Sequence, residues 1–319
     1  MTKDELRIVY MGTPEFAVAS LDALVSGGYN VVGVVTMPDK PAGRGYKVQF
    51  SAVKEYALAH NLTLLQPEKL KDEQFLEDLK ALKADLQIVV AFRMLPEVVW
   101  NMPPMGTFNL HGSLLPQYRG AAPINWAIIN GEKETGVTTF FLQHEIDTGD
   151  LILQKKIAIH RTDNAETIHD QLMALGAQTV VETVDCILDG TAPKMPQPEV
   201  AELKMAPKIF KETCKINWNS DCESIYNFVR GLSPYPTAWS ELMNDNREPI
   251  PMKIYAVTTE QTSHTHTRGT IITDGKKELK VACKGGFVII KSLQLSGKKR
   301  MNSDEFLRGY KIDLLKHLA

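Results

Sequence analysis

Continuous apolar segments alternate with helical spacing in the first part of the chain, and this alternation constrains the fold most. A largely apolar run at 6–11 ends at a glycine turn. Apolar side chains then recur at helical spacing from Phe16 to Leu24, and a second apolar run covers 31–36. Such runs are typical of strands covered on both faces of a parallel sheet. A strand, a helix and a second strand predict a right-handed crossover unit, and hence a Rossmann-like, doubly wound α/β domain.

A dinucleotide site is the first function to test for such a domain. The turn Gly12-Thr13-Pro14 lacks the spacing of the GxGxxG fingerprint, and no acidic residue is clearly placed to bind a ribose. The sequence therefore disfavours a dehydrogenase, which remains an alternative class that an NADH titration would detect.

The second part of the chain has a different pattern. Three prolines at 193, 196 and 198 predict a stiff linker. Short strands separated by turns follow, a spacing typical of a small barrel. With 319 residues there is room for two cores. We therefore expect a catalytic domain at 1–189, a linker at 190–205 and an OB-like β-barrel domain at 206–319.

Charge separates the two parts of the chain. Residues 1–204 hold 18 Lys and Arg against 26 Asp and Glu, a net charge of -8, whereas residues 205–319 hold 18 against 12, a net charge of +6. This asymmetry indicates that the second part contacts a polyanion such as a nucleic acid.

No targeting or membrane signal is visible. There is no apolar run of about 18 residues, and the N-terminus enters a strand directly. The four cysteines show neither CxxC pairing nor histidines at metal-ligand spacing. We expect a cytoplasmic protein without a metal site, with no membrane partner, and a monomer.

Three residues between 107 and 150 suggest a catalytic site. Asn109 and His111 stand two residues apart at the end of a short apolar strand, so they share one face. A second strand, 137–142, leads to Asp147. Acyl transfer to an amine needs a base, an oxyanion donor and a charge that orients the base. His111, Asn109 and Asp147 fit these roles. Hydrolysis and a purely structural role stay open from the residues alone.

The segments around these residues carry a family resemblance. NLHGSLLPQYRGAAP and DTGD, with GTPEF near the N-terminus and RGLSPYP at 230–236, resemble the folate-dependent formyltransferase family. The resemblance implies formyl transfer from 10-formyltetrahydrofolate to the α-amino group of methionyl initiator tRNA, by direct attack through a tetrahedral intermediate. It also implies that Asn109, His111 and Asp147 are the catalytic residues.

The same resemblance assigns binding residues. For the folate it implies backbone at a strand end, the shared motif and the loop before Asp147, which here are Val90, Ala91, Phe92, Ser113, Leu114, Leu115, Pro116, Gln143 and Ile146. An inserted loop with the pattern PAGRG would contact tRNA. We therefore expect tRNA contacts from the basic residues Lys40, Arg44, Lys298, Lys299 and Arg300. Arg93 stands where the family usually has glycine, which leaves the local backbone path open.

Relatives with other substrates share the same catalytic residues. A formyltransferase acting on glycinamide ribonucleotide or an amino sugar nucleotide, or a formyl-folate hydrolase, is the nearest alternative. The PAGRG loop and the basic second part favour tRNA. A nucleic-acid-binding module without activity explains the charge but not the Asn, His and Asp together.

Overall fold

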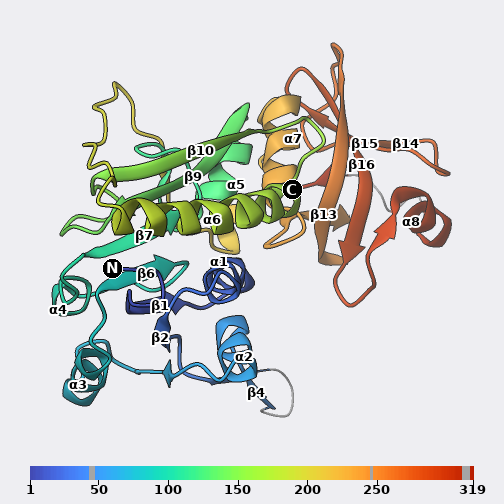
Figure 1. Ribbon diagram of the computed structural model, residues 1–319. Helices are drawn as coiled ribbons and strands as arrows, with labels where there is room; N and C mark the ends of the chain where they lie inside the picture. The colour runs from blue at the N-terminus through green and yellow to red at the C-terminus, as the bar shows by residue number, and fades with distance from the viewer. Residues whose placement is uncertain (43–46, 245–246, 311–316) are drawn as a thin grey trace. The chain divides into compact units, whose positions relative to one another are not determined.

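The computed structural model folds into two compact units (Figure 1). It describes residues 1–42, 47–244, 247–310 and 317–319. The first unit comprises 1–120, 135–157 and 169–204, and the second comprises 121–134, 158–168 and 205–319. Two segments before residue 189 therefore pack with the second unit, and the contiguous domain limits expected above stay a prediction.

A seven-stranded sheet forms the centre of the first unit, in the order β10-β9-β7-β6-β1-β2-β5. Its central neighbours run parallel, and β9 runs antiparallel to β7. This mostly parallel order confirms the Rossmann-like prediction. The strands are β1 (Ile8–Gly12), β2 (Val31–Val35), β5 (Leu64–Leu65), β6 (Leu86–Val90), β7 (Thr107–His111), β9 (Glu134–Phe141) and β10 (Leu151–Ala158).

Helices cover both faces of this sheet. Val9 and Met11 of β1 pack into one apolar cluster with residues of α3 and α4, whereas Tyr10, between them, donates to the Ala17 carbonyl of α1. Alternate side chains of one strand thus reach opposite layers. Side chains cap two of the helices, since Ser51 accepts from Lys54 N–H and Asp72 from Phe75 N–H. The helices are α1 (Glu15–Ser26), α2 (Ala52–Ala59), α3 (Glu73–Ala81), α4 (Glu97–Trp100) and α6 (Ala165–Leu188).

The long helix α6 lies directly against β7. A Cβ atom added at Gly176 would lie 2.7 Å from Leu110 Cδ2, closer than carbon atoms can pack. A larger residue at position 176 would require the Leu110 side chain to shift, so the glycine lets α6 pack closely on the strand. The face of β7 that carries Leu110 is therefore the face covered by α6.

The segment expected to be only a linker has contacts of its own. Met195 and Leu151 exchange backbone hydrogen bonds of 2.8 and 3.1 Å, so this segment runs antiparallel beside the start of β10. Residues up to 204 belong to the first unit. The proline-rich segment therefore packs, up to residue 204, as a part of the first unit.

The second unit is built around an antiparallel sheet in the order β14-β15-β16-β13-β12-β18, with β17 on β16. Thr270 and His317 bridge its two ends, and Leu318 N–H donates to the Gly269 carbonyl at 2.9 Å. This near-barrel confirms the small antiparallel barrel predicted. The strands are β12 (Ala238–Asn244), β13 (Arg247–Gln261), β14 (Ile271–Thr273), β15 (Leu279–Cys283), β16 (Gly286–Leu295), β17 (Met301–Asn302) and β18 (His317–Leu318).

Among the described residues, three α-helices lie wholly within this unit, and the apolar face of α7 explains why that segment is helical. In α7, Ile225 and Val229 recur at helical spacing and join the barrel core, while Asp221 caps its start by accepting from Ser224 N–H. The expectation of short strands separated by turns included neither β12 nor α8. The helices are α5 (Pro123–Ile129), α7 (Cys222–Gly231) and α8 (Ser303–Gly309).

Short elements complete the description. They are β3 (Lys40–Ala42), β4 (Lys47–Gln49), β8 (Arg119–Gly120), β11 (Met205–Ala206) and the 3-10 helix η1 (Glu212–Cys214). Within the described ranges no helix is long and apolar enough to cross a membrane.

Candidate active site

Strand β7 places Asn109 and His111 side by side at its carboxyl end. Asn109 is in register with Val89 of β6 and Phe140 of β9, so a neighbour on each side fixes its backbone. His111 is opposite Thr138. Because Leu110 faces α6, Asn109 and His111 occupy the opposite face of the strand. This end of the sheet is where open α/β folds bind their ligands.

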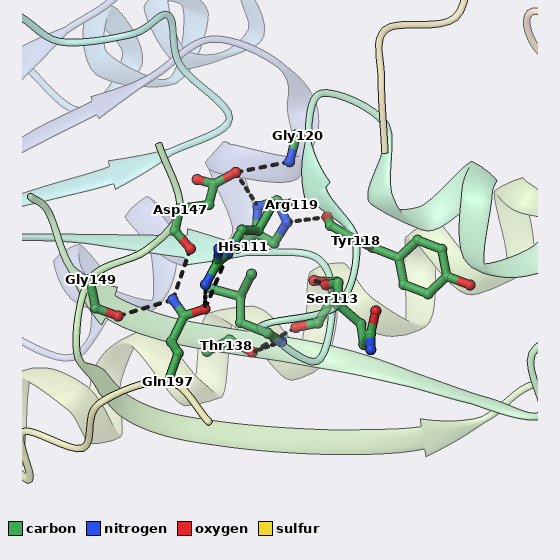
Figure 2. A network of polar contacts seen from close by, with 11 residues as sticks. His111, Ser113, Tyr118, Arg119, Gly120, Thr138, Asp147, Gly149 and Gln197 are labelled. Carbon is green, nitrogen blue, oxygen red and sulfur yellow. Dashed lines mark hydrogen bonds and ion pairs between the residues drawn. The ribbon is translucent and has the colours of Figure 1, made fainter. Parts of the chain in front are cut away.

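His111 is buried, with 7% of its surface exposed, and both ring nitrogens face oxygen atoms. Nε2 lies 2.9 Å from the Tyr118 carbonyl, and Nδ1 lies 4.0 Å from Asp147 Oδ2 (Figure 2). A carbonyl only accepts, so Nε2 carries the proton. The Asp147 contact is too long for a hydrogen bond. The tautomer is thus fixed by the Tyr118 carbonyl, and Nδ1 presents its lone pair on the side of Asp147.

Asp147 lies on the loop that follows β9, in an uncommon backbone conformation. Its φ is 56°, in the left-handed region, and Tyr118 has a φ of 61°. For tyrosine this region costs about 1–2 kcal/mol, whereas aspartate adopts it more readily. The Asp147 carboxylate accepts a hydrogen bond of 2.9 Å from Gly120 N–H. Both strained residues therefore face His111, as strained backbone often does at functional sites.

Gln197 joins this site from the proline-rich segment. Its amide nitrogen donates to the Asp147 and Gly149 carbonyls at 2.8 and 3.0 Å. Its amide oxygen accepts from Arg119 Nη2 and Nε at 2.6 and 3.2 Å. No pattern in the sequence indicated Gln197, because a glutamine between two prolines gives no signal for a contact with Asp147, 50 residues away.

The Asn109 side chain is half-buried beside His111. In the described part of the chain, no group is hydrogen-bonded to its amide. A half-buried amide without an internal partner is available to a bound molecule. Its N–H groups can therefore be offered to a substrate oxygen.

The residues expected to bind folate differ in exposure. Val90 is buried, Ala91 is exposed with a φ of 47°, and Phe92 is half-buried. Gln143 and Ile146 are exposed, the latter by 61%. An exposed isoleucine on a loop is accessible to an apolar ring. Ala91 and Ile146 thus suit a flat ligand better than Val90, which offers only backbone.

The motif after β7 is mostly internal. Ser113 is fully buried and donates to the Gln117 carbonyl at 2.7 Å. Thr138 donates to the Ser113 carbonyl and accepts from Leu115 N–H. Leu115 and Pro116 are buried and Leu114 is half-buried. These residues shape the turn that returns the Tyr118 carbonyl to His111, and the side chains of Ser113, Leu115 and Pro116 are not accessible to a ligand.

Arg93 has local partners where the family usually has glycine. Its guanidinium donates to the Pro67 carbonyl and, at 2.8 Å, to the Glu68 carbonyl. It lies over the Phe92 ring at 5.6 Å, and burial lowers the pKa of the guanidinium. The arginine thus ties the end of β6 to a neighbouring loop.

The basic residues expected to contact tRNA are only partly described. Arg44 lies outside the described residues, and Lys40 belongs to β3. Lys298 and Lys299 are exposed between β16 and β17. Arg300 is also exposed, but it donates to Ser292 at 2.9 Å and stacks over the Tyr255 ring. Of these, Lys298 and Lys299 present side chains to solvent without a structural role of that kind.

No group of three or more His, Cys, Asp or Glu side chains is placed to hold a metal ion within the described ranges. The functional groups that meet at the end of β7 are an imidazole, a carboxylate and an amide. These groups suit proton transfer and oxyanion stabilisation.

Two family patterns match the chain. Residues 6–184 match the family described as formyl transferase, and residues 208–311 match its C-terminal domain. The first match covers more than half of the chain. The chain therefore belongs to the formyl transferase family.

Curated relatives make the comparison more specific. The chain is 64% identical over 313 residues to the methionyl-tRNA formyltransferase of Bacteroides fragilis, with 97% of each chain covered. It is 57% identical to the methionyl-tRNA formyltransferase of Flavobacterium johnsoniae, with 96% of each covered.

Solved structures with much lower identity share the fold. An N-formyltransferase from Helicobacter canadensis, in complex with folinic acid and dTDP-3-aminofucose, has a TM-score of 0.64 at 19% identity and covers 93% of this chain and 100% of its own. HypX from Aquifex aeolicus, in complex with tetrahydrofolic acid, has a TM-score of 0.63 at 18% identity. This chain spans only 47% of the length of HypX.

Proposed function

We propose that the chain transfers the formyl group of 10-formyltetrahydrofolate to the α-amino group of methionyl initiator tRNA. One observation carries the proposal: in a chain 64% identical to a methionyl-tRNA formyltransferase, Nδ1 of His111, the Asp147 carboxylate and the Asn109 amide meet at the end of β7. Formylated initiator tRNA serves the start of protein synthesis.

His111 acts as the base in this proposal, through Nδ1. Nε2 is engaged as a donor to the Tyr118 carbonyl, so Nδ1 is the nitrogen with a free lone pair. The amine nitrogen attacks the formyl carbon, and its proton moves to Nδ1. The imidazolium that results lies beside the Asp147 carboxylate, 4.0 Å away, which stabilises the positive charge.

Asn109 stabilises the negative oxygen that forms in the same step. Its amide N–H groups, which have no partner among the described residues, donate to the oxyanion of the tetrahedral intermediate. When the intermediate collapses, the bond from carbon to N10 of the folate breaks. His111 then returns the proton from Nδ1 to N10, which balances the transfer.

The folate fits the residues around Ala91 and Ile146. Ala91 offers no side chain beyond Cβ, and Ile146 exposes an apolar surface. Both can contact a flat ring, and the exposed Gln143 can bond to its polar edge. The folate contacts of Ser113, Leu115 and Pro116 would be made through backbone.

For the tRNA, the proposal assigns Lys40, Arg44, Lys298, Lys299 and Arg300 to phosphate contacts. We expect Arg44→Ala to raise KM for methionyl-tRNA about tenfold, in line with the loss of one charged contact, and to leave folate binding intact. Steady-state kinetics with each substrate varied would measure this. An unchanged KM for tRNA would remove Arg44 from the interface.

A direct assay tests the whole proposal. Formyl transfer from 10-formyltetrahydrofolate should occur with methionyl initiator tRNA, and neither with methionyl elongator tRNA nor with free methionine. Hydrolysis of the folate without transfer would show that water is the acceptor of the formyl group. Transfer to an amino sugar nucleotide would show that the acceptor is a small amine. Our proposal includes a monomeric enzyme that acts in the cytoplasm, where its tRNA partner is found.

A further inference from the structure

We infer that Gln197 is a positioning residue that holds the Asp147 loop against His111. The inference rests on the proposed function, since it concerns how the same site is assembled. Gln197 lies on the segment expected to serve only as a linker, and no catalytic or binding role has been assigned to it above. It is half-buried, and its hydrogen bonds go to Arg119 and to the Asp147 loop.

Each polar atom of the Gln197 amide has a matching partner. The nitrogen has two N–H groups and donates to two carbonyls, those of Asp147 and Gly149. The oxygen accepts two hydrogen bonds from the Arg119 guanidinium. Figure 2 shows the amide between the loop and Arg119. All four hydrogen-bonding positions are therefore used, which fixes the rotamer and the orientation of the amide.

The loop needs such a contact because its backbone is strained. Asp147 has a φ of 56°, in the left-handed region that residues other than glycine adopt uncommonly. Without a partner for its carbonyl, the loop could relax and carry the carboxylate away from His111. The hydrogen bonds from Gln197 oppose that relaxation at the backbone of Asp147 itself.

The same dipeptide acts on Asp147 twice. Gly120 N–H holds the carboxylate directly, and Arg119 holds Gln197, which in turn holds the backbone. The segment that carries Gln197 is anchored to the sheet, because Met195, two residues before Gln197, is paired with Leu151. Three distant parts of the chain thus determine one carboxylate position.

The test is a double-mutant cycle on kcat, measured with both substrates saturating. Gln197→Ala should lower kcat about tenfold to a hundredfold, the usual effect of a misplaced catalytic group. The KM for methionyl-tRNA should stay within about twofold, because the residue acts on a transition-state interaction. In an Asp147→Asn background, Gln197→Ala should lower kcat by less than about twofold further, because coupled residues are not additive.

Gln197→Glu separates the two sides of the contact. The carboxylate keeps an acceptor for Arg119 but has no N–H for the Asp147 and Gly149 carbonyls. We expect this variant to lose as much kcat as Gln197→Ala. If Gln197→Ala does not fold, Gln197→Glu alone carries the cycle with Asp147→Asn.

Gln117→Ala is the matched control. Gln117 is also a glutamine that holds the proline-rich segment, through hydrogen bonds with Glu202 and Lys204 backbone, but it does not contact the Asp147 loop. Its effect should be equal in the wild-type and the Asp147→Asn background. A thermal melt of each variant records any loss of stability separately.

The outcomes distinguish this inference from the proposed function. A loss from Gln197→Ala that disappears in the Asp147→Asn background supports it. The inference is overturned if Gln197→Ala lowers kcat by the same factor in both backgrounds, or if neither Gln197 variant lowers kcat. Either result leaves the proposed site intact. If Asp147→Asn itself has wild-type kcat, the proposed role of Asp147 and this inference both fall.

Discussion

The two sides of the candidate site are built in different ways. Asn109 and His111 lie on β7, a strand with a hydrogen-bonded neighbour on each side. Asp147 lies on a loop with a positive φ, and among the described residues it accepts hydrogen bonds from Gly120 and Gln197. The strand side is held by regular backbone pairing, whereas the loop side depends on a few individual contacts.

This difference makes the strand side rigid and lets the loop side change its position. A ladder of backbone hydrogen bonds resists side-chain substitution, because each residue contributes the same backbone groups. A loop held by two side-chain-dependent contacts can move when one of them is lost. We therefore expect substitutions on the strand side to remove chemistry, and substitutions on the loop side to remove alignment.

The largest effect should come from His111→Ala. Loss of the base at a rigid position should lower kcat about 10²- to 10⁴-fold. The affinity for methionyl-tRNA, measured by a binding titration, should remain close to that of the wild type. Undiminished turnover would show that the strand side does not carry the base.

Asn109→Ala should follow, with kcat lower by about 10²- to 10³-fold, the usual cost of one oxyanion donor. The strand pairing should survive, because Asn109 pairs with Val89 and Phe140 through backbone. Single-turnover kinetics and a thermal melt would measure both. A large drop in melting temperature with normal turnover would contradict the comparison.

On the loop side, Gly149→Ala tests alignment without removing a functional group. A Cβ atom at Gly149 would lie 1.6 Å from the Phe141 carbonyl oxygen, so the loop must shift. We expect kcat to fall about tenfold to a hundredfold, as for a misplaced catalytic group. Gly309→Ala is the control, since a Cβ there meets nothing within 4 Å. Equal activity of the two variants would refute the loop's dependence on close packing.

The smallest effect on turnover should come from Thr138→Val. The buried Thr138 hydroxyl donates to Ser113 and accepts from Leu115 and Gln154. Its loss leaves buried groups without partners and should cost about 1–3 kcal/mol in the free energy of unfolding. Urea denaturation would measure it, with exposed Thr63→Val expected within about 0.5 kcal/mol of the wild type. A comparable loss from both variants would contradict this role.

Regular spacing in the sequence was sufficient to predict the strand that carries Asn109 and His111. The alternation of Asn109 and His111 follows from the period of two in any strand, and apolar runs predicted the parallel sheet. The sequence also placed Asp147 in the same region. The assignment of these three residues to catalysis remains a prediction that the kinetics above would test.

The contacts that hold the loop side of the site could not be predicted from the sequence, and the reason is physical. The Tyr118 carbonyl reaches His111 through a turn whose φ values no local pattern reveals. Gln197 meets Asp147 only because a proline-rich segment returns beside β10. Each contact joins a side chain to a backbone carbonyl, a group that every residue has. In the barrel, β12 and α8 were missed because their apolar residues do not recur at a regular strand or helix spacing.

Gly176 of α6 affects how β7 packs, although it lies far from β7 in the sequence. The helix packs on Leu110, the residue between Asn109 and His111, so closely that a methyl group at Gly176 would require the Leu110 side chain to shift. A residue far along the chain therefore influences how β7 packs beneath the candidate site. In a collection of natural variants, a change at Gly176 should be examined for an effect on the candidate site, even though it lies on the opposite face of the sheet.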